Sequence, residues 1–263
     1  MPDNNTVYFV GCGPGDPGLI TLKAMNLMQL ADVIVYSGSL INPRILEYAK
    51  KGVRLYDASL ISREEISKIL SESTKGGKLS IRLHDGDPSI FSTIREQIDR
   101  LEGDGLQCKV VPGITSLLAA AAEMNLELTL PGITQTLIVT RAELRTPVPN
   151  REKISELSKH GGTLVFYLSV HLIENIVKEL LEGEAYTKDT PAAIVYRAGW
   201  EDQKIIKGTL DNIVKKVKDA KVIKTALIIV GEVLAPRKYQ FSKVYDSAFT
   251  HGFRKASQSN GSF

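Results

Sequence analysis

The sequence predicts an α/β fold in two α/β domains, the first built on a mostly parallel sheet and the second on a mixed sheet. Three observations lead to this prediction. The chain has 263 residues, enough for one large domain or two small ones with real cores. In its first half, apolar segments of strand length alternate with helical patterns. In its second half, several strand candidates alternate in polarity or adjoin turns, which is typical of a mixed sheet.

The first half contains nine predicted elements. Apolar runs without alternation predict buried strands, and apolar residues at helical spacing predict the helices between them. Thr21 is a suitable N-cap, and the four residues from Ser62 to Glu65 resemble a capping box. In chain order the elements are strand 6–11, helix 19–30, strand 31–36, helix 43–49, strand 53–57, helix 62–74, strand 78–83, helix 89–102 and strand 108–113. Apolar strands separated by helices predict a parallel sheet covered on both faces.

The second half begins with a helix rich in small residues, 112–126, which we interpret as the junction of the two halves. The further elements are strands 134–143, 161–169, 190–199, 203–210 and 224–233, and helices 151–159, 170–182 and 210–220. The predicted domains are therefore residues 1–116 and 117–236. They are followed by a polar tail, residues 237–263, which its composition predicts to be disordered.

Composition excludes several classes of protein. The hydrophobic fraction of 43% and the charged fraction of 24% are those of an ordinary globular protein. A net charge of +3 is too small to indicate a nucleic-acid partner, although it suits an acidic small molecule. No apolar stretch approaches the ~18 residues of a membrane span, and the first residues do not resemble a secretory signal. Cys12 and Cys108 share no metal-ligand spacing, so we expect two buried free thiols in a cytoplasmic protein.

The glycine-rich loop after the first strand, Gly11–Asp16, has the wrong spacing for a dinucleotide. Such a fingerprint places glycines at its first, third and sixth positions, so that a pyrophosphate can rest on a helix N-terminus. Gly11 and Gly13 fit, but the sixth position is Asp16, whose carboxylate would repel a phosphate. The loop is therefore predicted to approach a different ligand closely.

Two more loops follow strands of the predicted parallel sheet. Asp85–Pro88 follows strand 78–83, and Pro112–Thr115 follows strand 108–113. Because the carboxyl ends of parallel strands meet at one edge of a sheet, these loops and Gly11–Asp16 are predicted to converge on a binding crevice. Ordinary turn chemistry explains any one of the three loops, but it explains the set less well.

Few other residues indicate chemistry. One predicted turn contains three possible metal ligands, His84, Asp85 and Asp87, but no second cluster of metal-ligating residues matches it. We therefore predict no metal site. Asp87 is interpreted as a solvated or hydrogen-bonding carboxylate. No serine lies in a nucleophile-elbow motif, and no Ser-His-Asp set can be assembled from spacing. No catalytic residue is therefore assigned.

Three arginines follow strands at the edge where binding loops are predicted: Arg141, Arg145 and Arg197. The planar guanidinium of arginine suits carboxylates, because it can bind them in bidentate fashion. Each can equally be solvated surface charge. Trp200, the one tryptophan, either packs at the base of its turn or forms the wall of a pocket.

Several motifs together resemble the tetrapyrrole methyltransferases that use S-adenosylmethionine, over about residues 7–235. These motifs are GCGPGDPGLIT, RLHDGDP, VVPGITS and TALIIVGEVL. Finer features resemble the precorrin-4 carbon-11 methyltransferases of cobalamin synthesis, namely YSGSLI, ELTLPGITQTLIVTR, YLSVH and YRAGWEDQ. Asp85 replaces the first of two glycines found in the uroporphyrinogen methyltransferases, and Glu201 stands where the branch often has proline.

The resemblance implies a cofactor site for S-adenosylmethionine, with S-adenosylhomocysteine as product, in a cleft between the two domains of a homodimeric enzyme. Carried over by position, the cofactor-binding residues are Pro14, Asp85, Gly86, Asp87, Ile90, Thr115, Ser116, Leu168, Ala198, Thr225 and Ala226. The glycine-rich first loop is expected to face the macrocycle. Asp16, Arg141 and Arg197 are the expected contacts to an acidic tetrapyrrole substrate. Any cobalt would arrive inside that substrate, and we favour cobalt-precorrin-4 over its metal-free counterpart.

Other functions stay open at this point. A sibling transferase would methylate another ring carbon, or a protein or RNA. A nicotinamide-dependent oxidoreductase would use the first loop for its dinucleotide, but Asp16 opposes this, as do Tyr36 and Ser37 where an acidic residue should end the second strand. A catalytically silent binding protein would share the fold, because fold does not fix function.

Overall fold

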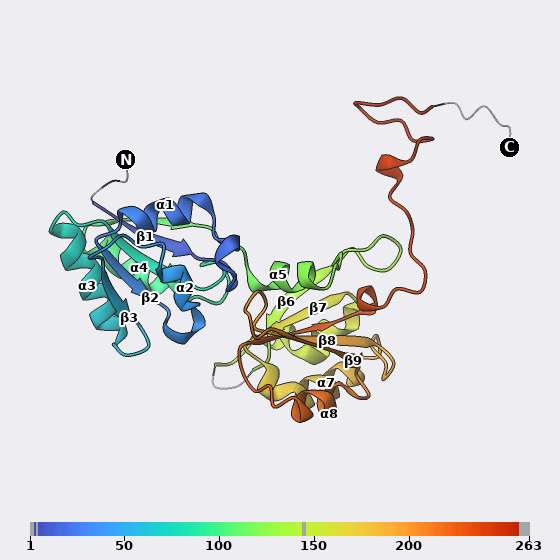
Figure 1. Cartoon of the computed structure of the whole chain (residues 1–263). Helices are drawn as coiled ribbons and strands as arrows, with labels where there is room; N and C mark the ends of the chain where they lie inside the picture. The colour runs from blue at the N-terminus through green and yellow to red at the C-terminus, as the bar shows by residue number, and fades with distance from the viewer. Residues whose placement is uncertain (1–2, 4, 144–145, 258–263) are drawn as a thin grey trace. The chain divides into compact units, whose positions relative to one another are not determined.

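The structure is a computed structural model that describes residues 3, 5–143 and 146–257 (Figure 1). By the packing of its backbone the chain divides into two compact units. Unit 1 consists of Met1–Asn125, Ile194–Ile206 and Val222–Leu227, and unit 2 of Leu126–Ala193, Lys207–Lys221 and Ile228–Phe263. Two late segments of the chain are thus part of unit 1, and both contain residues of the expected cofactor site. The domain limits at residues 116 and 236 stay a prediction.

Unit 1 is built on a five-stranded sheet in the order β3-β2-β4-β1-β5. Its strands are β1 (Thr6–Gly11), β2 (Val33–Tyr36), β3 (Arg54–Asp57), β4 (Ser80–His84) and β5 (Gln107–Val111). Every neighbouring pair is parallel. The predicted parallel sheet is confirmed, with each strand within about two residues of its expected limits. All five carboxyl ends therefore lie at one edge.

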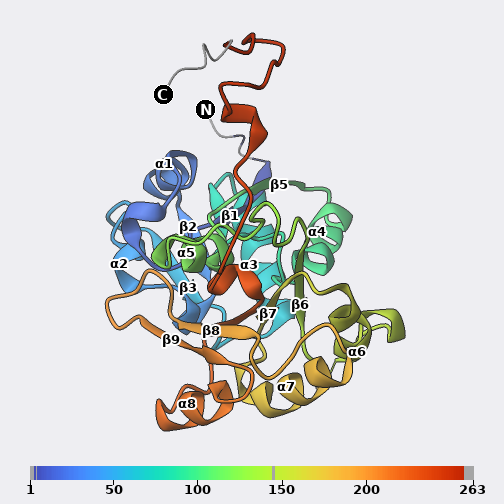
Figure 2. The same ribbon diagram turned by 90° about the vertical axis from the view of Figure 1, so that its right-hand side faces the viewer.

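Helices cover both faces of this sheet, as predicted (Figure 2). On one face, α1 (Leu22–Leu30) and α2 (Pro43–Leu46) pack on a core that includes Val10, Ile34 and Ile81. On the other face, α3 (Arg63–Lys75) and α4 (Ile94–Gly103) pack on Val7, Phe9 and Val35. Because successive side chains of a strand point to opposite faces, one apolar strand contributes to both cores. The strands therefore read as continuous apolar runs.

Local signals place the beginnings of two helices. The Thr21 hydroxyl accepts a hydrogen bond from the amide of Ala24 and caps α1. Ser62 and Glu65 form the complete capping box predicted for α3. The predicted start of α4 at Ser89 is wrong, because Phe91 and Thr93 have positive φ angles of 53° and 50°. A left-handed backbone interrupts a right-handed helix, so α4 begins only at Ile94.

The second sheet has the order β6-β7-β10-β8-β9. Its strands are β6 (Leu137–Arg141), β7 (Thr163–Tyr167), β8 (Pro191–Tyr196), β9 (Lys204–Thr209) and β10 (Ala226–Val230). The pairing of β6 with β7 is parallel and that of β7 with β10 antiparallel, which confirms a mixed sheet. The helices α7 (Ile173–Glu182) and α8 (Ile213–Asp219) lie along one face of this sheet (Figure 1).

The other helices are short. The predicted junction helix is α5 (Ser116–Glu123), and α6 covers only Ile154–Leu157. The single helix predicted over 151–159 is wrong, because Lys153 has extended φ and ψ angles and separates α6 from the turn before it. The 3-10 turns of the structure are Pro17–Leu19, Gly38–Leu40, Asn150–Glu152, Ser158–His160, Val170–Leu172, Glu232–Leu234 and Lys243–Tyr245.

Three sequence expectations concern surfaces and thiols. No helix in the described part of the chain is long and apolar enough to cross a membrane. Cys12 is buried, as expected, but Cys108 is only half-buried.

The predicted tail contains exposed aromatic side chains, with Phe241 and Tyr245 each 85% accessible. Its disorder stays a prediction, and residues 258–263 lie outside the described residues.

Candidate functional site

The three loops predicted to converge are in direct contact within unit 1. The amide of Cys12 donates to the carbonyl of His84 at 2.9 Å. Gly13 and Gly86 exchange two backbone hydrogen bonds, at 3.2 and 2.8 Å. The third loop joins them through the amide of Gly113, which donates to the Asp87 carboxylate at 2.9 Å. The carboxyl ends of β1, β4 and β5 therefore form one connected site.

Two glycines allow the loops to approach this closely. A Cβ atom at Gly11 would lie 2.6 Å from the carbonyl oxygen of Gly86 and 2.7 Å from the nitrogen of Gly113. A Cβ atom at Gly113 would collide with the same carbonyl oxygen. Because real side chains do not reach such distances, only glycine fits at either position. The three loops are therefore packed backbone to backbone.

The two aspartates of the middle loop have different surroundings. One oxygen of Asp87 accepts from Gly113 and the other from the amide of Ser89, at 2.8 Å. The interpretation of Asp87 as a hydrogen-bonding carboxylate is confirmed, and the residue connects the middle loop to the third loop. Burial raises the pKa of Asp85, while its own backbone amide and the charge of Arg82 oppose that rise. Asp85 is therefore the better candidate for contact with a ligand.

Arg82 lies under these loops and was missed from the sequence. Although its side chain is charged, the residue is only 7% accessible, because it lies on the middle strand of the sheet. Its Nε donates to the side chain of Gln97 at 3.1 Å, and one terminal nitrogen donates to the carbonyls of Val35 and Leu83 and to the hydroxyl of Ser37. These partners are uncharged, and burial lowers the pKa of Arg82 to about 10. The available signal was an arginine between two apolar residues, Ile81 and Leu83, within a predicted buried strand.

His84 is held in its neutral form. It is 2% accessible and stacks on Phe9 with 6.0 Å between ring centroids. Burial, and then the nearby charge of Arg82, lower its pKa to about 3.

Among residues 3, 5–143 and 146–257, no group of three or more histidines, cysteines or acidic residues is placed to hold a metal ion.

A turn from the late part of unit 1, Arg197–Gln203, lies on the first loop. The indole Nε1 of Trp200 donates to the carbonyl of Pro14 at 3.1 Å. The amide of Arg197 donates to the carbonyl of Thr225 at 3.0 Å, and Ala198, the next residue in the turn, is buried. This turn therefore brings together three of the expected cofactor residues, Pro14, Ala198 and Thr225, which are far apart in the sequence.

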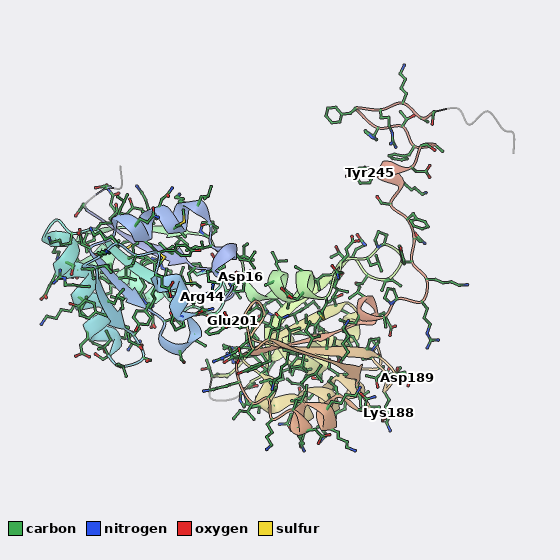
Figure 3. The ribbon with its side chains drawn as sticks, viewed as in Figure 1. Asp16, Arg44, Lys188, Asp189, Glu201 and Tyr245 are labelled. Carbon is green, nitrogen blue, oxygen red and sulfur yellow. The ribbon has the colours of Figure 1, made fainter. Side chains whose placement is uncertain are left out.

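The same turn carries charge near the loop. The Arg197 guanidinium lies 4.5 Å from the Trp200 ring centroid and pairs with Asp202 at 2.8 Å. Arg44 pairs with Glu201 at 2.7 Å, and Figure 3 shows these two side chains and Asp16. The substitution of glutamate for an expected proline at position 201 thus creates an exposed ion pair.

Three of the expected site residues have a strained backbone conformation. Of the eight non-glycine residues with positive φ in the described chain, three are Leu168, Arg197 and Thr225, with φ angles of 54°, 47° and 54°. A positive φ is unusual for a β-branched residue such as Thr225. Such strain persists where surrounding structure enforces it, and it is frequent at binding sites. Sequence alone gave no signal of it.

The remaining expected cofactor residues divide between the units. Unit 1 contains Ile90 just after the middle loop, Thr115 and Ser116 at the beginning of α5, and Ala226 next to Thr225. All four are half-buried. Leu168 belongs to unit 2 and is 64% accessible. Ten of the eleven expected cofactor residues therefore lie in unit 1.

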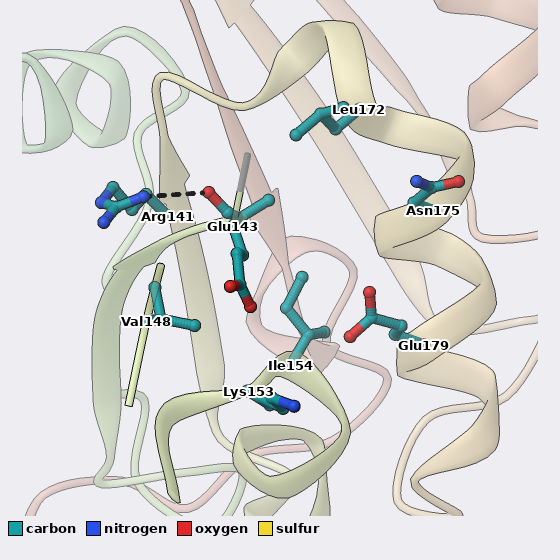
Figure 4. A pocket seen from close by; sticks show the side chains of 9 residues that line it. Arg141, Glu143, Val148, Lys153, Ile154, Leu172, Asn175 and Glu179 are labelled. Carbon is teal, nitrogen blue, oxygen red and sulfur yellow. Dashed lines mark hydrogen bonds between the residues drawn. The ribbon is translucent and has the colours of Figure 1, made fainter. Parts of the chain in front are cut away.

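Arg141 has a different setting, in unit 2. Its guanidinium donates to the backbone carbonyls of Ala142, Thr146 and Pro147, so it shapes its own loop. It also lines a pocket of about 240 Å³ with both charged and apolar walls (Figure 4). Arg145 lies outside the described residues.

Asp16 does not lie in a pyrophosphate site. Its carboxylate accepts a hydrogen bond from the amide of Gly18 at 2.7 Å. The element that follows is a three-residue 3-10 turn, Pro17–Leu19, instead of a long helix. A dinucleotide fingerprint needs the N-terminus of a helix at this place, so the local geometry agrees with the spacing argument.

Comparisons with known proteins agree with this geometry. A family model described as Tetrapyrrole (Corrin/Porphyrin) Methylases matches residues 6–214. The cobalt-precorrin-4 C(11)-methyltransferase of Methanocaldococcus jannaschii is 49% identical over 256 residues, which are 97% of this chain and 98% of that protein.

Two solved structures are also similar. A cobalt precorrin-4 methyltransferase of cobalamin biosynthesis matches with a TM-score of 0.86 and 38% identity, over 90% of this chain and 99% of the other. A uroporphyrin-III C-methyl transferase from Thermus thermophilus, complexed with S-adenyl homocysteine, matches with a TM-score of 0.73 and 32% identity, over 87% and 98% of the two chains. The chain belongs to the tetrapyrrole (corrin/porphyrin) methylases, the family that its motifs predicted.

Proposed function

We propose that this protein transfers a methyl group from S-adenosylmethionine to carbon 11 of cobalt-precorrin-4. The observation that carries the proposal is the 49% identity, over 97% of the chain, to a relative named for that reaction. A second cobalt-precorrin-4 C(11)-methyltransferase, from Priestia megaterium, is 40% identical over 96% of the chain. Similarity at this level over nearly the whole length supports a common reaction as well as a common fold.

The connected loops of unit 1 suit the cofactor. The loops are packed backbone to backbone, and Asp85 adds a carboxylate that can accept from hydroxyl or ammonium groups. The relative solved with S-adenyl homocysteine supports use of this cofactor. We propose that Pro14, Asp85, Gly86, Ile90, Thr115, Ser116, Leu168, Ala198, Thr225 and Ala226 bind it, and that Asp87 holds the loops.

The chemistry needs little from the protein beyond alignment. The bound cofactor supplies a methyl group already activated on a sulfonium; its carbon–sulfur bond breaks as the carbon–carbon bond forms, and sulfur keeps the electron pair. The residues of the site orient the two molecules and exclude water. In model systems, orientation of this kind supplies on the order of 7–11 kcal/mol. No covalent catalyst is therefore required.

Arg197 is the arginine best suited to orient a substrate with many carboxylates. Its guanidinium lies beside the first loop, between the rings of Tyr196 and Trp200. Arg141 instead uses its nitrogens to hold its own loop. Arginine binds carboxylates in bidentate fashion, so Arg197→Ala should weaken tetrapyrrole binding and spare cofactor binding. Equal loss of both affinities by calorimetry would contradict this assignment.

The direct test is anaerobic incubation with cobalt-precorrin-4 and a cofactor carrying a ¹³C-labelled methyl group. We expect one label per macrocycle at carbon 11, located by mass spectrometry and NMR. Metal-free precorrin-4 and uroporphyrinogen III serve as comparison acceptors. Faster transfer to either of them, or a label at another ring carbon, would favour a sibling reaction.

An oxidoreductase is the alternative from another class. A thermal-shift comparison separates the two: stabilisation by S-adenosylhomocysteine and not by NAD supports the transferase.

We further propose that the protein is a cytoplasmic homodimer, as the family resemblance implies. Light scattering coupled to gel filtration tests the dimer, and a mass equal to one chain would contradict it.

A further inference from the structure

We infer that Trp200 is a positioning residue that holds Pro14, the one residue of the first loop expected to contact the cofactor, in place for cofactor binding. The inference rests on the proposed function and extends it to a residue that the family motifs do not assign. Trp200 reaches the loop from 186 residues away in the chain. Its indole Nε1 donates to the carbonyl of Pro14 at 3.1 Å, so it fixes one peptide of the loop directly.

The loop is shaped to receive the indole. A Cβ atom at Gly15 would collide with the five-membered ring of Trp200 and would lie 2.9 Å from Cε2. Gly15 therefore has no space for a side chain because the indole occupies it. A Cβ atom at Gly199, in the same turn as Trp200, would lie 3.2 Å from the nitrogen of Asp16. Two glycines, one on each side, thus allow the turn and the loop to touch.

The turn that carries Trp200 is itself held at several points. Gln203 accepts from the amide of Gly199 at 2.7 Å and donates to Glu123, at the end of α5, at 2.9 Å. The amide of Arg197 bonds the carbonyl of Thr225. Because Ala198 and Thr225 are also expected cofactor contacts, the indole connects two parts of one site. Its removal should loosen the site more than the fold.

Arg197 adds a connection to the substrate. Its guanidinium lies 4.5 Å from the Trp200 ring, close enough for a cation–π interaction. A tetrapyrrole carboxylate that attracts Arg197 would compete with Asp202 and alter its stacking on the indole. Trp200 would then transmit substrate binding to Pro14. A tryptophan that only packs would have no such effect.

The test compares Trp200→Phe with Glu201→Gln, a change in the same turn at an ion pair whose side chains are 59% and 82% accessible. Calorimetry gives the affinity for S-adenosylhomocysteine without any tetrapyrrole. Phenylalanine keeps an aromatic ring but loses the N–H, so we expect affinity to fall about 3- to 10-fold, the effect of one hydrogen bond. Loss of one hydrogen bond should also lower the melting temperature by a few degrees at most, and Glu201→Gln should bind within about twofold of the native chain.

In steady-state assays, Trp200→Phe should raise the KM for the cofactor by a similar factor while kcat changes less. Native affinity in Trp200→Phe, within twofold, would overturn the inference. Failure of the native protein to bind S-adenosylhomocysteine at all would instead overturn the proposed function. The two proposals therefore fail on different measurements.

Gly15→Ala provides a second variant if Trp200→Phe does not fold. It keeps every atom of Trp200 but should displace the indole from the loop, because the alanine Cβ would occupy the space of the indole ring. Trp200 is the one tryptophan in the sequence, so fluorescence emission reports its environment alone. We expect the emission maximum to shift to longer wavelength and the affinity to fall together. Unchanged affinity, with or without a shifted emission, would overturn the inference.

Discussion

The Asp87 carboxylate accepts a hydrogen bond from the backbone amide of Gly113 at 2.9 Å and so ties the end of β4 to the end of β5. Its second oxygen accepts from Ser89 at 2.8 Å. Asp87→Ala removes both acceptors, and we expect the free energy of unfolding to fall by about 1.5–3 kcal/mol, the range for hydrogen bonds to charged groups. Urea unfolding measures this change.

Asp189→Ala is the matched control for Asp87→Ala, since Asp189 is an exposed aspartate of unit 2 (Figure 3). It should change stability by less than about 0.5 kcal/mol. If Asp87→Ala has an equally small effect, the carboxylate does not hold the loops.

Gly113→Ala should damage the site through contact of its Cβ atom with the carbonyl oxygen of Gly86 and with the backbone of Gly11. All of these atoms belong to the backbone, so none can move aside as a flexible side chain would. We expect a loss of about 1–3 kcal/mol in stability, typical of overpacking, and weaker binding of S-adenosylhomocysteine. Denaturant unfolding and calorimetry measure the two effects.

The control for Gly113→Ala is Gly103→Ala, at the end of α4. No atom lies within 4 Å of a Cβ at that glycine. Alanine there should be neutral or stabilising, by up to about 1 kcal/mol. Similar losses from both substitutions would show that close approach is not the cause.

His84 should make stability depend on pH. Its pKa is lowered from 6.5 to about 3, chiefly by burial. Between these values the unfolded chain binds a proton that the folded chain does not, so stability falls as pH drops from about 6.5 towards 3 and is unaffected above that window. The loss from this group is at most about 1.4 kcal/mol per pH unit, or about 2 kcal/mol at pH 5.

His84→Phe keeps a ring stacked on Phe9 and removes the titration. We expect the difference in unfolding free energy between pH 7 and pH 5 to shrink by about 2 kcal/mol in this variant. An unaltered pH dependence in His84→Phe would mean that His84 is protonated as easily in the folded chain as in the unfolded one.

Local patterns in the sequence predicted much of this structure. Apolar runs in the first half and alternating or turn-flanked segments in the second predicted all ten strands, and Thr21 and Ser62 marked helix starts, because strand burial and helix capping depend on neighbouring residues. The start of α4 could not be predicted, since the positive φ angles of Phe91 and Thr93 follow from loop packing.

The candidate site was predictable only in part. Convergence of the three loops follows from parallel topology, and the structure confirms it. The bonds from Arg82 to Val35 and from Trp200 to Pro14 join residues that are 47 and 186 positions apart, and no local pattern indicates such partners. The cofactor residues themselves came from family resemblance, and their roles stay predictions until binding is measured.

Truncation of the tail tests the predicted limit near residue 236. Within residues 237–257, Phe241 and Tyr245 are each 85% accessible and Phe253 is fully accessible. Side chains that bury so little area contribute little to stability. The amide of Gln240, however, donates to the carbonyl of Pro131 at 2.9 Å, and the Gln240 side chain packs where a Cβ of Gly132 would lie.

Two truncated chains separate these contributions. A chain that ends at Gln240 should melt within about 2 °C of the full-length protein, whereas one that ends at Lys238 loses the contact with Pro131 and should melt several degrees lower. Calorimetric melting at matched protein concentration measures both. A large drop in melting temperature for the chain that ends at Gln240 would show that the aromatic side chains are buried in solution. The tail would then be part of a folded domain.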